Sequence, residues 1–257
     1  MVPLPETIAD RVAAHTWRPV RAGKSGAEVY ELTGPGSHLF LKVERLHPAR
    51  DPLAEADRLR WLAGRQPVPA VVGVEADQQR SYLLTAALPG SPASDPTWTS
   101  QPARCAALLG RALRQLHDLP VDGCPFDTGF DAELRRATSN VAHGLVDAAH
   151  FDPEHQGRTP ASLLAELSQQ RPTREERVLI HGDASLKNFV IDDWRLSGMV
   201  DLGRFGVGDR YHDLAQALRS IRKALGPPAL DDFVAAYRLS AQDEERLATY
   251  RLLDELF

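Results

Sequence analysis

The fold is decided by the stretch Val178-Leu-Ile-His-Gly-Asp183-Ala-Ser-Leu-Lys-Asn188-Phe-Val-Ile191. Its two ends, 178–180 and 189–191, are apolar and rich in β-prone residues, which predicts two short strands around a polar loop. A third short strand is expected over 196–200, and it delivers Asp201-Leu-Gly203 at its end. Polar residues at the ends of strands are a common way to build a site, so this stretch predicts one.

The spacing of Asp183, Asn188 and Asp201 is the one that protein kinases use: an Asp, an Asn five residues later and a downstream Asp-x-Gly. Phosphoryl transfer from ATP needs one carboxylate to orient the attacking hydroxyl, and an amide oxygen with a second carboxylate to hold Mg²⁺ on the phosphates. We therefore expect Asp183 to be catalytic and the other two residues to bind the metal. The alternative is that all three are ordinary turn residues. Their ordered occurrence argues against it.

Composition indicates an ordinary globular protein of one or two domains, with 257 residues, 43% hydrophobic and 25% charged. A net charge of −5 and a pI near 6.0 argue against a nucleic-acid partner, which selects a basic surface, and suit a cationic substrate.

Targeting and membrane signals are not expected. The N-terminal residues Met1-Val-Pro-Leu-Pro-Glu6 have neither a basic start nor an apolar core, and no segment reaches the ~18 apolar residues that span a bilayer. The prediction is a cytoplasmic protein without membrane contact. Cys105 and Cys124 do not make a disulfide framework and are expected to be reduced.

The N-terminal part predicts a hairpin over 26–43, which places Lys42 on a strand. Just before it, Gly23-Lys-Ser25-Gly26 is a loop whose backbone N–H groups and Ser25 hydroxyl could face a phosphate; the alternative is a plain glycine turn.

A helix is predicted from Asp51 onward because apolar residues recur there at helical spacing. Glu55 falls at the edge of the apolar stripe, where a carboxylate is costly unless it is paired. Lys42 is the natural partner, as in the lysine and glutamate pair that positions ATP phosphates in kinases. The alternative is a solvated Glu55.

A lobe boundary is predicted where the apolar strand 81–88 runs into the proline-rich segment 89–96, giving domains 1–88 and 89–257. Adenine binding at such a hinge uses backbone groups, for which we expect the Ala86 carbonyl and the Leu88 N–H. Beyond the boundary, helices are predicted over 103–117 and 131–146 and from Asp209 onward. Asp213 is expected to accept backbone hydrogen bonds that fix the catalytic loop, and His117 to be a packing residue.

Three ordered segments strongly resemble the aminoglycoside 3′-phosphotransferases: His181-Gly-Asp-Ala-Ser-Leu-Lys-Asn188, Val200-Asp-Leu-Gly-Arg-Phe-Gly-Val-Gly-Asp-Arg-Tyr-His-Asp-Leu-Ala215 and Leu252-Leu-Asp-Glu-Leu-Phe257. The resemblance covers nearly the whole chain. It implies an α+β, two-lobed, protein-kinase-like fold with a small β-rich lobe and a larger helical lobe. It also implies transfer of the ATP γ-phosphate, with Mg²⁺, to a 3′-hydroxyl of drugs of the kanamycin and neomycin type, and hence antibiotic resistance.

The resemblance assigns further roles residue by residue. Lys42 and Glu55 would hold the α- and β-phosphates, and Arg204 and Arg219 would lie at the substrate site. The acidic positions that match the family and the chain end would accept hydrogen bonds from the drug's ammonium groups. These residues are Asp152, Glu154, Asp254, Glu255 and the carboxylate of Phe257. Convergent carboxylates suit a polycation because charge-assisted hydrogen bonds are strong.

The chain departs from the family pattern near the expected drug site. His150 and Pro153 stand where members carry acids, and Lys223 stands where some carry Glu. Each change lowers the local negative charge, so we expect weaker binding of highly cationic drugs or a narrower substrate range. Two alternatives stay open: a kinase of the same fold for another small alcohol, and a catalytically silent nucleotide-binding protein. No protein partner is implied.

Overall fold

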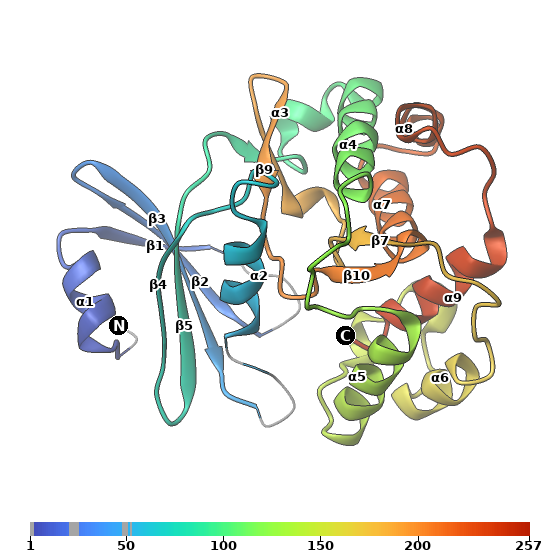
Figure 1. Ribbon diagram of the computed structural model, residues 1–257, viewed down its shortest axis with the longest axis horizontal. Coiled ribbons are helices and arrows are strands. Elements are labelled where there is room, and N and C mark those ends of the chain that lie inside the picture. The colour runs from blue at the N-terminus through green and yellow to red at the C-terminus, as the bar shows by residue number, and fades with distance from the viewer. Residues whose placement is uncertain (1–2, 21–25, 48–50, 52) are drawn as a thin grey trace. The chain divides into compact units, whose positions relative to one another are not determined.

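The computed structural model describes residues 3–20, 26–47, 51 and 53–257. The chain divides into two compact units, Met1–Leu88 and Pro89–Phe257, which Figure 1 colours from blue to red along the sequence. The first unit is built around a β-sheet and the second is mainly helical, so the predicted α+β, kinase-like class is confirmed. Within the described ranges, every helix is too short or too polar to cross a bilayer.

The described part of the N-terminal unit forms a five-stranded antiparallel sheet in the order β1-β2-β3-β5-β4. The predicted hairpin is confirmed as β2 and β3, and the predicted helix and strand as α2 and β5; α1, β1 and β4 were not predicted. The elements are α1 Glu6–Val12, β1 Thr16–Val20, β2 Glu28–Gly34, β3 Ser37–Arg45, α2 Ala54–Leu62, β4 Val71–Ala76 and β5 Arg80–Ala86.

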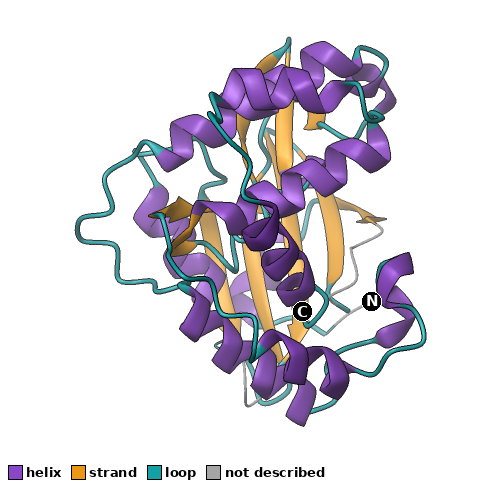
Figure 2. Cartoon of the chain, turned by 90° about the vertical axis from the view of Figure 1, so that its right-hand side faces the viewer, coloured by secondary structure: helices purple, strands orange, loops and turns teal. Residues whose placement is uncertain are grey.

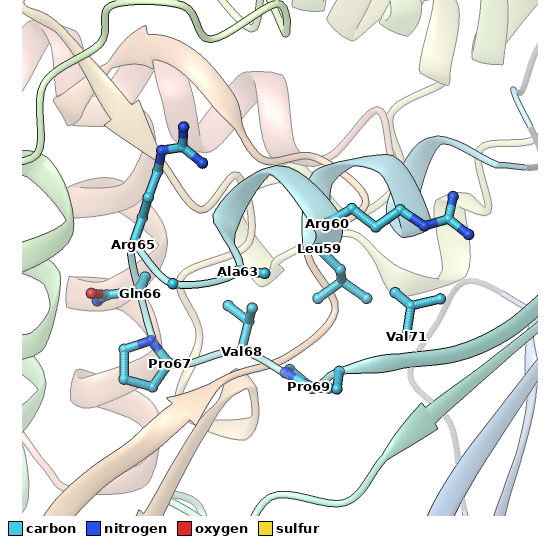
Figure 3. A pocket seen from close by; sticks show the side chains of 11 residues that line it. Leu59, Arg60, Ala63, Arg65, Gln66, Pro67, Val68, Pro69 and Val71 are labelled. Atoms are coloured by element: carbon cyan, nitrogen blue, oxygen red, sulfur yellow. The ribbon is translucent and has the colours of Figure 1, made fainter.

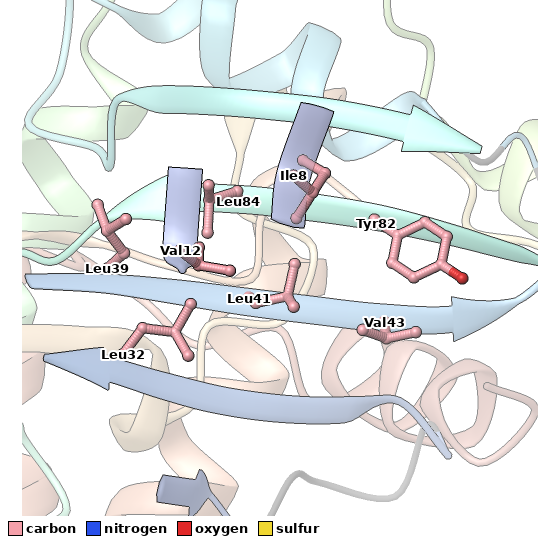
Figure 4. Close-up of a cluster of buried hydrophobic side chains, with 8 residues drawn as sticks. All are labelled: Ile8, Val12, Leu32, Leu39, Leu41, Val43, Tyr82 and Leu84. Atoms are coloured by element: carbon pink, nitrogen blue, oxygen red, sulfur yellow. The ribbon is translucent and has the colours of Figure 1, made fainter. Parts of the chain in front are cut away.

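The core of this unit lies between α1 and one face of the sheet. Leu39, Leu41 and Val43 alternate along β3 and are buried against Ile8 and Val12 of α1, as Figure 4 shows. Complete burial of a residue of this size stabilises the fold by about 1.5–3 kcal/mol. Because side chains alternate across a strand, the residues between these three face the opposite side, where Figure 1 shows α2.

Helices, which Figure 2 draws in purple throughout the chain, predominate in the C-terminal unit. The helices are α3 Pro96–Thr99, α4 Pro102–His117, α5 Phe130–Ala142, α6 Pro160–Leu167, α7 Arg210–Ala224, α8 Ala229–Tyr237 and α9 Glu244–Asp254, with 3₁₀ turns η1 Ala148–His150, η2 Pro153–His155 and η3 Leu186–Asn188. The strands are β6 Ser91–Pro92, β7 Arg177–Ile180, β8 Phe189–Asp192, β9 Arg195–Met199 and β10 Gly206–Asp209.

The predicted helices of this unit are present, but α5 ends four residues before the predicted Val146. Gly144 has a φ of 66°, the left-handed conformation that commonly terminates helices. The three predicted strands are β7, β8 and β9. β7 pairs with β10, and β8 pairs with β9; both pairs are antiparallel. The polar loops lie at the ends of these paired strands.

Candidate functional site

The loop that carries Asp183 follows β7 directly. Gly182 has a φ of 83°, and a Cβ there would collide with the Arg204 carbonyl oxygen. Only glycine fits this position without strain. The side chain of Asp183 is 28% exposed, so a substrate group can reach it.

Asn188 and Asp201 lie at neighbouring ends of β8 and β9. Nδ2 of Asn188 donates to the Asp183 carbonyl at 2.8 Å, which presents its Oδ1 as the acceptor. The Val200 N–H donates to the Asn188 carbonyl at 3.0 Å, which brings Val200, and with it the next residue Asp201, close to Asn188. Asp201 has a φ of 58°. One amide oxygen and one carboxylate fit Mg²⁺, which takes one or two protein ligands together with substrate phosphates.

Asp213 of α7 fixes the start of the catalytic loop, as predicted. It accepts the backbone N–H of His181 at 2.7 Å and of Gly182 at 2.8 Å, and Nε2 of His117 at 3.1 Å. His117 in turn contacts the Tyr237 hydroxyl at 2.7 Å, which confirms it as a packing residue. Burial opposes ionisation of Asp213, yet the bonds from His117 and the loop hold its pKa below the ordinary value.

Two further residues of α7 bond the same loop and were not predicted. Oε1 of Gln216 accepts the Ala184 N–H at 2.7 Å, and Oγ of Ser220 accepts the Leu186 N–H at 3.0 Å. With Asp213 they form the α7 polar stripe, at spacings of three and four residues on one helix face. These polar residues recur at helical spacing on a helix whose other buried residues are mostly apolar, and this pattern was the sequence signal for them.

Lys187 was also missed. Its Nζ lies 3.3 Å from Oδ2 of Asp183, four residues earlier. It sets a positive charge beside the candidate catalytic carboxylate.

Arg204 and Arg219 converge on Asp254 at the end of α9. Arg204 donates to one carboxylate oxygen at 3.1 Å and Arg219 to the other at 3.0 Å. Arg219 also donates to Asp152 at 2.8 Å. Burial disfavours the charged form of Asp254, but the two guanidinium groups hold its pKa below the usual range.

The other predicted acceptors differ in their surroundings. The Glu255 side chain is 3% exposed, and it accepts the Asp152 N–H at 3.0 Å and contacts His155 at 2.9 Å. The centre of the Phe257 ring lies 3.8 Å from the Arg204 guanidinium carbon, and Glu154 is exposed. Asp254 and Glu255 thus have partners within the chain, and their contact with substrate stays a prediction.

The N-terminal unit contains the predicted ion pair. Nζ of Lys42 lies 2.8 Å from Glu55 and 3.5 Å from Glu44. Gly26 has a φ of 72°, as a turn glycine does, and Ser25 lies outside the described residues. The predicted adenine-contacting residues are 86, the last of β5, and 88, the last of this unit.

A groove of about 680 Å³ lies at the end of α2 and along the segment that leads to β4 (Figure 3). It is lined by Leu59, Arg60 and residues 63–71. None of the predicted site residues lines it, so it adds nothing to the site described above.

Comparisons with known proteins found relatives of this chain in both sequence and structure. The sequence model of the phosphotransferase enzyme family matches residues 16–250. An aminoglycoside 3′-phosphotransferase of Streptomyces fradiae is 39% identical, with 98% of each chain covered, and one of Escherichia coli is 34% identical, with 99% of this chain and 95% of that protein covered. A streptomycin 3″-kinase of Streptomyces griseus is 34% identical over 93% of this chain and 92% of that protein. The crystal structure of an aminoglycoside-3′-phosphotransferase of type VIII has a TM-score of 0.89 and 38% identity, covering 98% of this chain and 97% of that one.

Proposed function

The chain belongs to the phosphotransferase enzyme family, and we propose that it transfers the γ-phosphate of ATP to the 3′-hydroxyl of an aminoglycoside antibiotic and so gives resistance. The observation that carries this proposal is the loop of Asp183, which Asn188 and the α7 polar stripe hold in one conformation.

In this reaction Asp183 orients the drug hydroxyl and takes its proton. The hydroxyl oxygen bonds to the γ-phosphorus as the bond to the β,γ-bridging oxygen breaks, and ADP leaves with that electron pair. The exposed face of the carboxylate suits this role. Lys187 beside it offers a positive charge to the transferring phosphoryl group.

The nucleotide would be held by groups of several kinds. We assign Mg²⁺ to Asn188 and Asp201; when bound, it neutralises charge on the phosphates. Lys42, held by Glu55, is assigned to the α- and β-phosphates. Further contacts are assigned to Ser25 and Gly26 at the phosphates and to the Ala86 carbonyl and Leu88 N–H at adenine. Dependence on ATP is the reason to propose a cytoplasmic location.

The acceptor would be recognised by carboxylates of the C-terminal unit, those of Asp152, Glu154, Asp254 and Glu255, and by Phe257. Arg204 and Arg219 hold Asp254 in place, so an ammonium group that reaches this carboxylate would compete with them for its oxygens. The net charge of −5 favours the approach of a polycation.

A second candidate acceptor is streptomycin. It is favoured by the 34% identity to a streptomycin 3″-kinase and by the neighbour of 28% identity and TM-score 0.79, covering 97% of this chain and 95% of that one, whose structure contains ADP and streptomycin. His150 and Lys223, both exposed, lower the negative charge of this unit and favour a less cationic drug.

The test is ADP release from Mg-ATP with kanamycin, neomycin, a kanamycin analogue without the 3′-hydroxyl, and streptomycin. We expect turnover with the first two alone. Turnover of streptomycin alone would replace the proposed acceptor, and turnover of none would reject the drug-kinase proposal.

Asp183→Ala is the active-site variant for the same assay, and Asp122→Ala, at an exposed position of the same unit, is its control. The first should lose at least about 10³-fold in kcat while still binding ATP, because the positioned carboxylate is lost. The control should match the unchanged protein. A substantially active Asp183→Ala enzyme would remove this residue from the mechanism.

A further inference from the structure

Gln216 of α7 lies where three segments of the C-terminal unit meet. Its Oε1 accepts the Ala184 N–H at 2.7 Å, and its Nε2 donates to the Gly182 carbonyl at 3.1 Å and to Oδ1 of Asp254 at 2.7 Å. The residue is 4% exposed. One buried amide therefore bonds the backbone on both sides of Asp183 and also a carboxylate at the end of α9.

The partners of this amide determine its orientation. The Ala184 N–H can only donate, whereas the Gly182 carbonyl and an ionised Asp254 can only accept. A half-turn of the amide would oppose like groups at all three contacts. Glutamate at 216 would set a second carboxylate against Asp254, and methionine would leave the buried Ala184 N–H without this acceptor.

We propose that Gln216 is a positioning residue that transmits the state of Asp254 to the loop carrying Asp183. Asp254 is also bonded by Arg204 and Arg219, so an ammonium group arriving at it competes with these partners and with Nε2. The same nitrogen bonds Gly182, so a change at Asp254 alters the backbone beside the catalytic carboxylate. The inference rests on the proposed function, which makes Asp183 catalytic and Asp254 part of the acceptor site.

The kinetic test compares Gln216→Met and Gln216→Glu with a control, Thr249→Val. Thr249 is 2% exposed, and its hydroxyl donates to the Glu245 carbonyl at 3.0 Å within α9, so the control removes a buried hydrogen bond that does not reach the loop. Gln216→Met should lower kcat about 10- to 100-fold, since small displacements of a catalytic group have effects of this size, and should change the KM for ATP less than threefold. Gln216→Glu should lower kcat further.

The control should lose thermal stability but keep kcat within about twofold. If Gln216→Met keeps the kcat of the unchanged enzyme, or if it and the control lose kcat equally, Gln216 acts only through stability and the proposal is overturned.

Hydrogen exchange of the amides of residues 181–188, measured without substrate, tests the coupling itself. The Ala184 amide should exchange faster in Gln216→Met and, to a smaller extent, in Asp254→Asn. The double variant should exchange no faster than Gln216→Met alone. Unchanged exchange in Asp254→Asn, or additive effects in the double variant, would overturn the proposal. Hydrogen exchange tests the coupling between Asp254 and the loop without any turnover. If the unchanged protein turns over no aminoglycoside, that finding refutes only the proposed function.

Discussion

Asp213→Asn removes one charge from the centre of the C-terminal unit at almost constant volume. Both carboxylate oxygens of Asp213 are used: Oδ1 accepts the Gly182 N–H, and Oδ2 accepts the His181 N–H and Nε2 of His117. Asparagine offers one oxygen and one NH₂ group. If the oxygen stays with His181 and His117, the NH₂ group opposes the Gly182 N–H, and that buried donor loses its acceptor.

The free-energy cost follows from these contacts. A hydrogen bond to a charged group contributes about 1.5–3 kcal/mol against about 1 kcal/mol for a neutral one, and an unsatisfied buried donor costs about 1–3 kcal/mol. At the middle of these ranges, two weakened bonds and one orphaned N–H sum to about 4.5 kcal/mol at neutral pH, where the lowered pKa keeps Asp213 ionised. In a unit of this size that loss lowers Tm by about 9–18 °C.

The assay is urea and thermal unfolding at pH 7 followed by circular dichroism, with kcat measured on the same samples. The matched control is Asp118→Asn. Asp118 is the C-cap of α4, its side chain is 53% exposed, and its carboxylate pairs with Arg114 one turn earlier on the helix. This substitution should cost less than about 0.5 kcal/mol. We expect kcat to fall with Asp213→Asn, because the loop loses an anchor next to Asp183. If Asp213→Asn is as stable as the control, the reasoning about this buried carboxylate is refuted.

The remaining predictions concern the ion pair and the pH dependence of stability. Glu55→Gln removes the nearer of the two carboxylates beside Lys42, so the KM for ATP should rise about tenfold while the KM for the drug changes little in initial-rate assays; equal increases in both would contradict the assignment. Burial and then the charge of Arg204 lower the pKa of His212. As the pH falls, His212 is therefore protonated in the unfolded chain before it is protonated in the folded protein. The free energy of unfolding should fall as pH drops below about 6.5, by up to about 1.4 kcal/mol per pH unit. His212→Gln should flatten that slope in urea unfolding between pH 7.5 and 5.5; an identical slope would reject it.

Several elements of the N-terminal unit were missed because their local patterns are weak. α1 has seven residues, of which only Ile8 and Val12 are buried. β1 is an edge strand that contains Pro19 and has no fully buried residue, so it shows neither clear alternation nor a typical strand composition. Both become stable only by packing against β2 to β5, which a local pattern does not show.

Candidate site residues that are close in sequence were predictable. Asp183 and Asn188 are five residues apart around one 3₁₀ turn, so their spacing nearly determines their contact. Lys42 and Glu55 are thirteen apart, yet strand alternation and a helical stripe pointed each toward the other, and the pair is present. In these cases the backbone geometry of one or two elements decides which side chains meet.

The sequence by itself determined the strands on either side of the polar loops, the order of those loops and the identity of the residues in them, because periodicity and turn chemistry act over a few residues. Only the tertiary structure decided which buried groups bond one another. Gln216 meets residue 184 and residue 254 across separations of 32 and 38, and Glu255 meets residue 152 across 103. These contacts depend on how α7 and α9 pack against the loops, and helix packing is set by side chains from the whole unit.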